Sequence, residues 1–437
     1  MKKLFMFAIA IIFFNSCQND DATADSSFAM KSATADYSGY PATVQTVSGN
    51  ITTNTTWTND RVWEVSGVVR VIGAKLTIQA GTFIKAKPLA AGVATGVLVI
   101  TKTGQIDAQG TATAPVIFTS YNLLDGNATT KAAAGDFGGV VLLGDAQTNT
   151  GSVQNVIEGL GDQANVSDFY YGGSNNTHNA GALNYVRIEF AGRILNADTG
   201  VEINGLTCGG VGSGTVIDHV QVSYGRDDSF EFFGGTVNAS HLVSFAPDDD
   251  NFDFDFGYTG SITKAIAIAD YNSTHSLSGG NPDSNGIELD NNATGTTGTP
   301  ATLITRPVIS QLSIIGASAI AGGALYENAI HVRRLGQISL TNATVTGYVT
   351  GIRFESPSLP ANSARSFLSV HAFTDPILPA GTSLGAGSSP ASTAILADSW
   401  GLTQPFFNDG TLNLAGATGA FKTEQNWTNT WTKFTNF

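Results

Sequence analysis

The sequence predicts an all-β protein wound into a solenoid of stacked coils, and three observations support this fold class. First, the segment Asp227–Phe232 returns as Asp249–Phe254, 22 residues further along the chain. Second, the 437 residues include 50 glycines and only 13% charged residues, against a usual charged content of about 25%. Third, no stretch beyond the N-terminus keeps a helical periodicity. Such a chain suits short strands joined by tight turns.

The repeated segment has looser copies elsewhere in the chain. Each copy has a small polar residue, an apolar residue, a charged residue or histidine, and a second apolar residue. A unit that recurs in this way indicates a repeat architecture, in which successive units stack on one another. The copies are Thr199–Ile203, Asn285–Leu289, Asn328–Val332 and Thr350–Phe354.

A further strand is expected before each charged unit, so that each coil carries two strands. Where the spacing between coils exceeds 22 residues, the inserts Ser273–Asn285 and Asn291–Thr302 are expected to loop out of the coil. Inserts of this kind commonly gather on one face, which is often the binding face. The expected preceding strands are Tyr185–Phe190, Val216–Ser223, Val237–Ser244, Ile262–Ala269, Val308–Ile315 and Ile338–Val345.

Two glycine-punctuated phrases near the start, Leu76–Thr82 and Gly110–Ser120, resemble the opening rungs of right-handed parallel β-helices. In those proteins glycines form the corners, and the apolar residues of each strand point into the coil. The resemblance implies a single right-handed parallel β-helix over residues 46–401. The alternative is a β-sandwich, which predicts hairpin turns and antiparallel alternation instead of stacked identical motifs.

The N-terminus carries two lysines, an apolar run over Leu4–Phe14, and then Asn15, Ser16 and Cys17. The run is too short to span a bilayer, and residues 1–16 are typical of a secretory signal peptide. The end of this run resembles the lipobox of bacterial lipoproteins, although Phe14 stands where leucine is usual. The resemblance implies cleavage before Cys17 and acylation of that residue.

The residues after Cys17 resemble the short acidic export tag of lipoproteins that Bacteroidota display on their surface, here Gln18–Asp21. This resemblance implies an outer-membrane protein, held by lipid at Cys17 and exposed at the cell surface. Residues 17–45 are poor in large apolar side chains and are expected to form a flexible tether.

At the other end, residues 402–437 are expected to cap the open end of the solenoid, because a bare sheet edge invites aggregation. Trp427 and Trp431 dominate this segment, and the alternative role for such a pair is stacking on a sugar. Together with the lipobox and the acidic rungs, this ending resembles a family of uncharacterised β-helical lipoproteins from Bacteroidota. That resemblance bears on fold and location and says little about activity.

The formal net charge is −14, which argues against nucleic acid or anionic lipid as a binding partner. Cations, neutral glycans and basic proteins remain compatible partners. Cys208 is the only cysteine besides Cys17, so no intrachain disulfide is expected in the mature chain.

The charged positions of the repeats are expected to form an acidic column of side chains that point out to solvent, because the apolar residues on either side must point into the coil. At the spacing of stacked strands, about 5 Å, neighbouring charges repel by about 3–4 kcal/mol at an effective dielectric near 20. A bound cation, raised pKa values, basic side chains or splayed side chains should offset this repulsion. The expected column is Glu202, Glu231, Asp253 and Glu288.

Calcium is the candidate cation, because further oxygen ligands precede two of these positions and calcium accepts six to eight oxygens in irregular geometry. The expected ligand set is Asp228, Glu231, Asp250 and Asp253. The alternative is that these turn residues only cap backbone N–H groups and keep the surface soluble.

The run Asp250–Asp253 also resembles the calcium motif of certain calcium-dependent polysaccharide lyases, which would imply a basic side chain as the catalytic base. Glu288 stands where that group carries its lysine, which leaves Arg226, Arg333 and Arg353 as weak candidates for the base. The histidines His219, His241 and His275 are interpreted as lying in unrelated rung positions, so no zinc site is expected.

The sequence therefore favours a surface-anchored module that binds glycan, matrix or a surface protein along an acidic face over residues 196–290. A calcium-dependent polysaccharide lyase or another carbohydrate-active enzyme is the competing hypothesis, and a structural spacer is the third.

Overall fold

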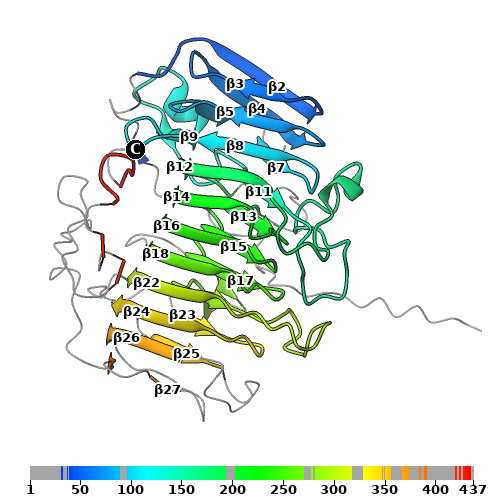
Figure 1. Ribbon diagram of the computed structural model, residues 1–437. Helices are drawn as coiled ribbons and strands as arrows, with labels where there is room; N and C mark the ends of the chain where they lie inside the picture. Colours follow the sequence, from blue (N-terminus) through cyan, green and yellow to red (C-terminus); the bar gives the residue numbers. More distant parts are fainter. Residues whose placement is uncertain are drawn as a thin grey trace, which may run out of the picture.

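The structure is a computed structural model that describes residues 31–32, 37, 39–88, 96–192, 202–269, 277–278, 281–316, 328–346, 348, 350–355, 367–373, 383–384, 388–390, 419–420, 423–424 and 427–434. Nearly all its strands belong to one hydrogen-bonded sheet that winds from coil to coil (Figure 1). Every strand pairing within this sheet is parallel. The predicted right-handed parallel β-helix is confirmed, and the β-sandwich is excluded.

The first coils are built from short strands with glycine corners. Gly67, Gly73 and Gly81 have φ angles of 70°, 62° and 77°, in the left-handed region that glycine adopts without steric cost. The strands are β2 (Val44–Ile51), β3 (Thr55–Trp57), β4 (Val62–Val71), β5 (Lys75–Ile78), β6 (Phe83–Ala86), β7 (Val97–Ile100), β8 (Gln105–Gln109) and β9 (Val116–Thr119).

From β11 onwards, each coil combines a short strand with a long one. The long strands are β12 (Gly181–Glu189), β14 (Val216–Ser223), β16 (Asn238–Phe245), β18 (Ser261–Ile268), β22 (Val308–Ile315), β24 (Ser339–Thr346) and β26 (Phe367–Phe373). The short ones are β11 (Gly139–Leu143), β13 (Leu206–Gly209), β15 (Phe230–Phe233), β17 (Phe252–Asp255), β21 (Glu288–Leu289), β23 (Asn328–Val332) and β25 (Thr350–Phe354).

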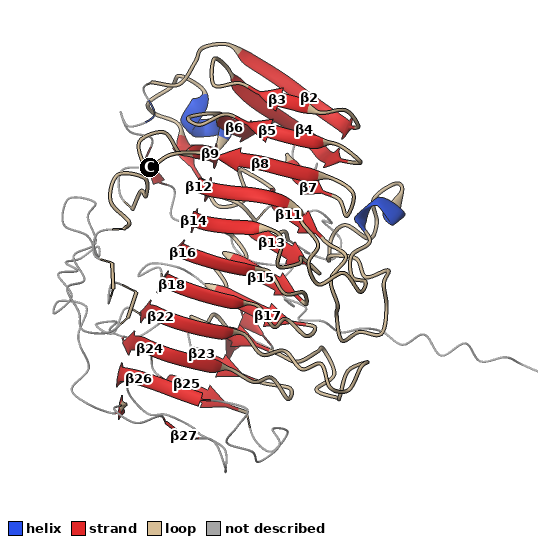
Figure 2. Ribbon diagram, viewed as in Figure 1, coloured by secondary structure: helices blue, strands red, loops and turns tan. Residues whose placement is uncertain are grey.

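The remaining elements are small. Two pairs of short strands are antiparallel, β1 (Lys31–Ser32) with β10 (Lys131–Ala132) and β19 (Leu277–Ser278) with β20 (Asn281–Pro282). Strands β27 (Ser383–Leu384) and β28 (Ser389–Pro390) follow β26, and the 3₁₀ turns η2 (Tyr121–Leu124) and η3 (Val166–Phe169) lie within the described residues (Figure 2).

The strands expected before the charged units are confirmed. Five of the six match an observed long strand to within one residue at either end, and the sixth, β12, begins four residues earlier than expected. Inside the coils the aromatic residues of neighbouring rungs stack face to face. The rings of Phe230 and Phe252 are 5.2 Å apart, and those of Phe232 and Phe254 are 5.4 Å apart. Each fully buried phenylalanine contributes about 1.5–3 kcal/mol of stability.

A long insert between β11 and β12 folds back over the outside of the short strands. Its residues Leu160, Phe169 and Tyr171 form a second buried apolar cluster with side chains of β7, β11 and β15. The face of the solenoid that carries the charged column is therefore partly covered; in Figure 2 the loops that project to the right, around η3, belong to this insert.

The aromatic C-terminal segment does cover the solenoid, but its described part lies along a flank instead of across the open end. Gly419 N donates to the carbonyl of Asn342, Trp431 packs edge-on against Tyr185, and Lys433 exchanges two hydrogen bonds with Gln221. These contacts run from β24 back to β12, against the chain direction (Figure 1). We call the described residues of this segment, 419–420, 423–424 and 427–434, the strap. It flanks the coils because its aromatic rings find stacking partners there.

Among the residues that the structure describes, no helix has the length and apolar character needed to cross a bilayer. Residues 1–30, which include Cys17 and the expected signal peptide, lie outside the described part.

Candidate functional site

Most of the expected charged column exists. The parallel ladders place Glu231 beside Asp253, Asp253 beside Glu288, Glu288 beside His331, and His331 beside Arg353. The flanking Phe230 and Phe232 point into the coil, as the alternation predicts. The column therefore changes from acidic to basic along the stack.

Glu202 does not belong to this column, which corrects the sequence-based expectation. The position beside Glu231 is taken by Thr207 of β13. Glu202 precedes that strand because the first copy of the unit is only a partial match to the others. Its carboxylate accepts a hydrogen bond from Arg226 Nε instead. Burial and the charge of Asp227 raise the pKa of Glu202 to about 9, although Arg226 acts in the opposite direction.

The expectation that the column faces solvent is also wrong. Glu231 is only 5% exposed and Glu288 only 3% exposed, although both point away from the coil axis. Glu231 lies under the insert between β11 and β12, whose Glu158 is close enough to raise the pKa of Glu231 further, after burial and the charges of Asp253 and Asp228. Glu288 is in contact with Arg333 and Asn285 instead. Alternation along a strand determines which way a side chain points, and it carries no information about a loop that covers it.

Three of the four expected calcium ligands come together. Asp228, Glu231 and Asp253 each offer a carboxylate oxygen, and these oxygens all lie within 4.8 Å of one another. Asp250 is not part of this group: its own N–H donates to Asp228 at 2.9 Å, and its carboxylate accepts a hydrogen bond from the backbone N–H of Asn285. It braces the turn that holds Asp228.

These carboxylates suit a hard cation. Burial first, and then neighbouring carboxylates, raise the pKa values of Asp228, Glu231 and Asp253 well above their usual range. The oxygen Oδ1 of Asp253 is buried without a hydrogen-bond partner in the described part of the chain, and an unpaired buried polar atom is costly. An oxygen-only donor set of this kind is what calcium prefers. The residues present therefore fit the cation that the sequence suggests.

Two of the three arginines proposed as catalytic bases are held by carboxylates. Arg226 pairs with Glu202, and Arg333 donates to Glu288 and, at 2.9 Å, to Asp290. Arg353 takes its place in the column, beside His331. An arginine fixed in ion pairs keeps its proton and serves better as an electrostatic partner than as a base.

His331 is the neutral member of the column. It is 5% exposed, and neither ring nitrogen has a hydrogen-bond partner among the described residues. Burial, together with the nearby charges of Arg333, Arg353 and Arg334, lowers its pKa to about 3. The imidazole is therefore uncharged at neutral pH.

Beside the acidic end lies a groove of about 590 Å³ between the β11–β12 insert and the loop that follows β21. Phe233 and Phe256 line it together with Tyr171, and amide and hydroxyl side chains line the rest. The loop after β21 was predicted from its composition as an insert on the binding face. The β11–β12 insert was not predicted, because no repeat or composition pattern marked it. The polar lining residues include Asn149, Thr150, Ser152, Gln154, Asn155, Asn292, Thr294 and Thr296.

Glu158 also lines this groove. Burial, and then the charge of Asp227, raise the pKa of Glu158 to about 8. At neutral pH this carboxyl group therefore holds its proton, inside a groove that also offers aromatic rings.

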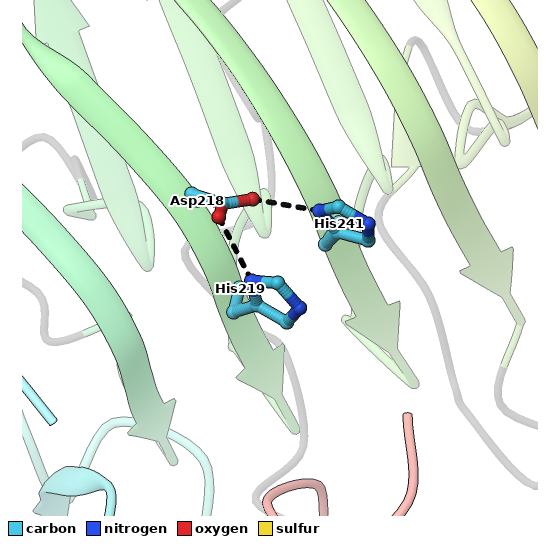
Figure 3. A group of neighbouring side chains, drawn as sticks. All are labelled: Asp218, His219 and His241. Carbon is cyan, nitrogen blue, oxygen red and sulfur yellow. Dashed lines mark hydrogen bonds and ion pairs between the residues drawn. The ribbon is translucent and has the colours of Figure 1, made fainter. Parts of the chain in front are cut away.

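The interpretation of the histidines is corrected as well. His219 and His241 occupy equivalent positions on neighbouring strands, β14 and β16, and their rings stack with centroids 4.1 Å apart. Asp218 lies between them and contacts both (Figure 3). The 22-residue spacing of His219 and His241 could have revealed this pairing. His275 lies outside the described residues.

A family model described as a pectate-lyase like beta helix domain matches residues 49–432. No match to the chain was found among curated proteins or among solved structures.

Proposed function

The chain belongs to the family of pectate-lyase-like β-helix domains, and from this premise we propose that it binds glycans at the cell exterior, in the groove beside its acidic rungs. The observation that carries the proposal is the lining of that groove. Aromatic rings offer flat apolar faces with a polar edge, and the surrounding amides and hydroxyls offer both donors and acceptors. This combination suits the apolar faces and hydroxyl groups of a sugar chain.

Calcium at Asp228, Glu231 and Asp253 completes the proposed site. Glu231 lies on the rung that also carries Phe233, Asp228 lies just before it, and Asp253 is the neighbour of Glu231 on the next rung. Glu158, which lines the groove, lies close enough to Glu231 to affect its pKa, so a cation there would border the groove. A bound cation would stabilise the charged form of the three carboxylates and would offer a contact to a negatively charged sugar.

The proposed anchor is the acyl chain on Cys17, which would hold the protein in the outer membrane of a Bacteroidota cell, exposed at the surface. The support is the lipobox-like sequence that ends the apolar run, followed by Gln18–Asp21. Replacing Cys17 with alanine should move the protein from the membrane fraction to the soluble fraction and abolish labelling by a radioactive fatty acid. Persistence of the label would contradict the anchor.

Binding is tested by titrating the purified protein with a panel of neutral and uronate-containing polysaccharides, with and without calcium. Phe256→Ala should weaken the affinity for the bound glycan, because that half-buried ring lines the groove. Val153→Ala is the control, since Val153 is 57% exposed on the β11–β12 insert, beside the groove, but does not line it. Equal affinities for the two variants would refute the groove as the binding site.

The second candidate is a carbohydrate-active enzyme, and Glu158 is the observation that favours it. A carboxyl group that keeps its proton at neutral pH can serve as a general acid toward a glycosidic oxygen. The same polysaccharide panel should then yield shortened or unsaturated products, and Glu158→Gln should abolish them while preserving binding. If the polymer is still intact after a long incubation, the enzyme hypothesis is rejected and the binding function is retained. The third hypothesis, a structural spacer, does not explain a groove lined by aromatic and polar side chains.

A further inference from the structure

Asp218, His219 and His241 form a compact cluster on the long strands β14 and β16, whereas the acidic column lies on the short strands. Long strands β12, β14, β16, β18 and β22 each bend at one residue with a positive φ, and these residues are Tyr185, His219, His241, Lys264 and Gln311. The registers of neighbouring strands skip over this position in every pair. The bend therefore repeats from coil to coil and lines up the side chains that it carries.

The ligand atoms of the cluster converge. Oδ2 of Asp218 lies 2.9 Å from Nδ1 of His219, and its Oδ1 lies 2.7 Å from Nδ1 of His241 (Figure 3). The two nitrogens and one carboxylate oxygen all lie within 4.8 Å of one another. The histidines are mostly buried, whereas the Asp218 side chain is 31% exposed, which leaves a path from solvent.

A second layer of polar groups orients these side chains. Ser240 donates a hydrogen bond to Oδ1 of Asp218 at 2.6 Å. On the far side of its ring, Nε2 of His241 lies 3.3 Å from Oε2 of Glu424, which belongs to the strap, and 3.2 Å from Nζ of Lys264, which also forms an ion pair with Glu424. A carboxylate on the distal nitrogen of a histidine, and a hydrogen bond to the ligating carboxylate, are the outer contacts that metal-binding histidines and acids commonly have.

We propose that Asp218, His219 and His241 bind a divalent transition-metal ion of the zinc class, and that this ion fastens the strap to the flank of the solenoid. Two imidazole nitrogens with one carboxylate oxygen form a donor set that suits zinc and excludes calcium, which takes oxygen ligands. With three protein ligands, the remaining position is left for water.

The link to the strap follows from the chemistry of histidine. When Nδ1 of His241 binds the ion, the ring proton resides on Nε2 and can be donated to Glu424. Trp427 packs edge-on against His241 at 5.1 Å, and Trp431 against His219 at 5.5 Å. An ion that fixes both rings therefore fixes the surface on which the strap lies.

Without the ion, Nδ1 of His241 shares a hydrogen bond of 2.7 Å with Oδ1 of Asp218, whereas Nδ1 of His219 lies 2.9 Å from Oδ2 and is buried without a hydrogen-bond partner among the described residues. For the ion to bind, Nδ1 of each ring must present its lone pair, so a proton on Nδ1 moves to Nε2. The buried, unpartnered nitrogen of His219 sets the proposed site apart from a fully hydrogen-bonded cluster that merely attracts cations.

The test is isothermal titration of the untagged full chain, stripped with EDTA, with zinc chloride. We expect one site of micromolar or tighter affinity. His219→Gln and His241→Gln should each abolish the site. Glu424→Ala should weaken it by about 10–100-fold, the usual effect of removing an outer partner.

His331→Gln is the control, because His331 belongs to a different candidate cluster, with Asp283 and Glu288. If zinc binding survives His219→Gln and disappears in His331→Gln, or if the stripped chain takes up no zinc, the proposal is overturned.

A second readout concerns the strap itself. Zinc should slow tryptic cleavage after Lys433 in the unmodified chain, and this protection should vanish in His219→Gln and in Glu424→Ala. Calcium at the same concentration should give no protection. Protection that persists in both variants would overturn the proposed link between the ion and the strap.

Discussion

Asp253 is the residue on which the acidic site depends most. It sits between Glu231 and Glu288 in the column, and its Oδ1 lacks a hydrogen-bond partner within the described chain. Burial and the charges of Asp255 and Asp290 raise its pKa, and Arg333 only partly compensates. The folded protein therefore disfavours the charged form of Asp253 unless a cation is present.

Asp253→Asn should have opposite effects with and without calcium. In EDTA the melting temperature should rise, because asparagine removes a charge that the fold disfavours. With calcium at 100 times its dissociation constant, the wild type should gain about 2.7 kcal/mol and the variant should gain much less. Thermal melts measure both. Asp60→Asn is the control, because the Asp60 carboxylate is 60% exposed and distant in sequence from Asp253. Calcium should stabilise this variant as much as it stabilises the wild type. If calcium also stabilises Asp253→Asn as much as the wild type, the calcium site is refuted.

At the scale of elements, the sequence predicts the strands well because apolar residues alternate with polar or charged ones in the repeated units. The inward direction of Phe230 and Phe252 and the register of the charged units follow from that pattern. Coverage of the column does not follow, because it depends on a distant insert whose Leu160 and Phe169 find their partners only in three dimensions. Likewise, the bends at His219 and His241 are left-handed conformations that their residue types do not reveal.

Release of the strap should affect only the strap itself and should leave the β-sheet folded. Trp431 is fully buried and packs against Tyr185 and His219, and its Nε1 donates to the carbonyl of Trp427. Trp431→Ala should cost about 3–5 kcal/mol of the strap's docking free energy. We expect rapid proteolysis within residues 419–434 while the circular dichroism of the β-sheet is retained.

Val308→Ala is the matched control for this strap variant, since Val308 lies on the long strand β22 but is 49% exposed. It should leave the digestion pattern unchanged. If Trp431→Ala also leaves the pattern unchanged, the strap does not depend on its aromatic contacts.

At the scale of the whole molecule, buried carboxyl groups with raised pKa values should make stability depend on pH in an unusual direction. The folded pKa values of Glu158 and Glu202 are raised to about 8 and about 9, against about 4.3 in an unfolded chain. Between these values the folded state holds more protons than the unfolded state, so stability falls as the pH rises. His331, with its pKa lowered to about 3, acts in the opposite direction, but only below about pH 6.5.

From pH 6.5 to about 8.5 the carboxyl groups dominate, and above about pH 8.5 the Cys208 thiol, whose pKa is raised by burial, adds an effect of the same sign. In EDTA, each of them should lower the free energy of unfolding by up to about 1.4 kcal/mol per pH unit as far as its folded pKa. The melting temperature should consequently be lower at pH 9 than at pH 6.5. Calcium should reduce this difference, because it binds the deprotonated carboxylates that high pH produces. Glu158→Gln should flatten the profile near pH 8, since it removes one of the titrating groups. A melting temperature that rises across this range would mean that the buried carboxyl groups stay ionised in the folded protein. The repulsion along the column would then be relieved by ion pairs, such as that of Arg333 with Glu288, instead of by protons or a cation.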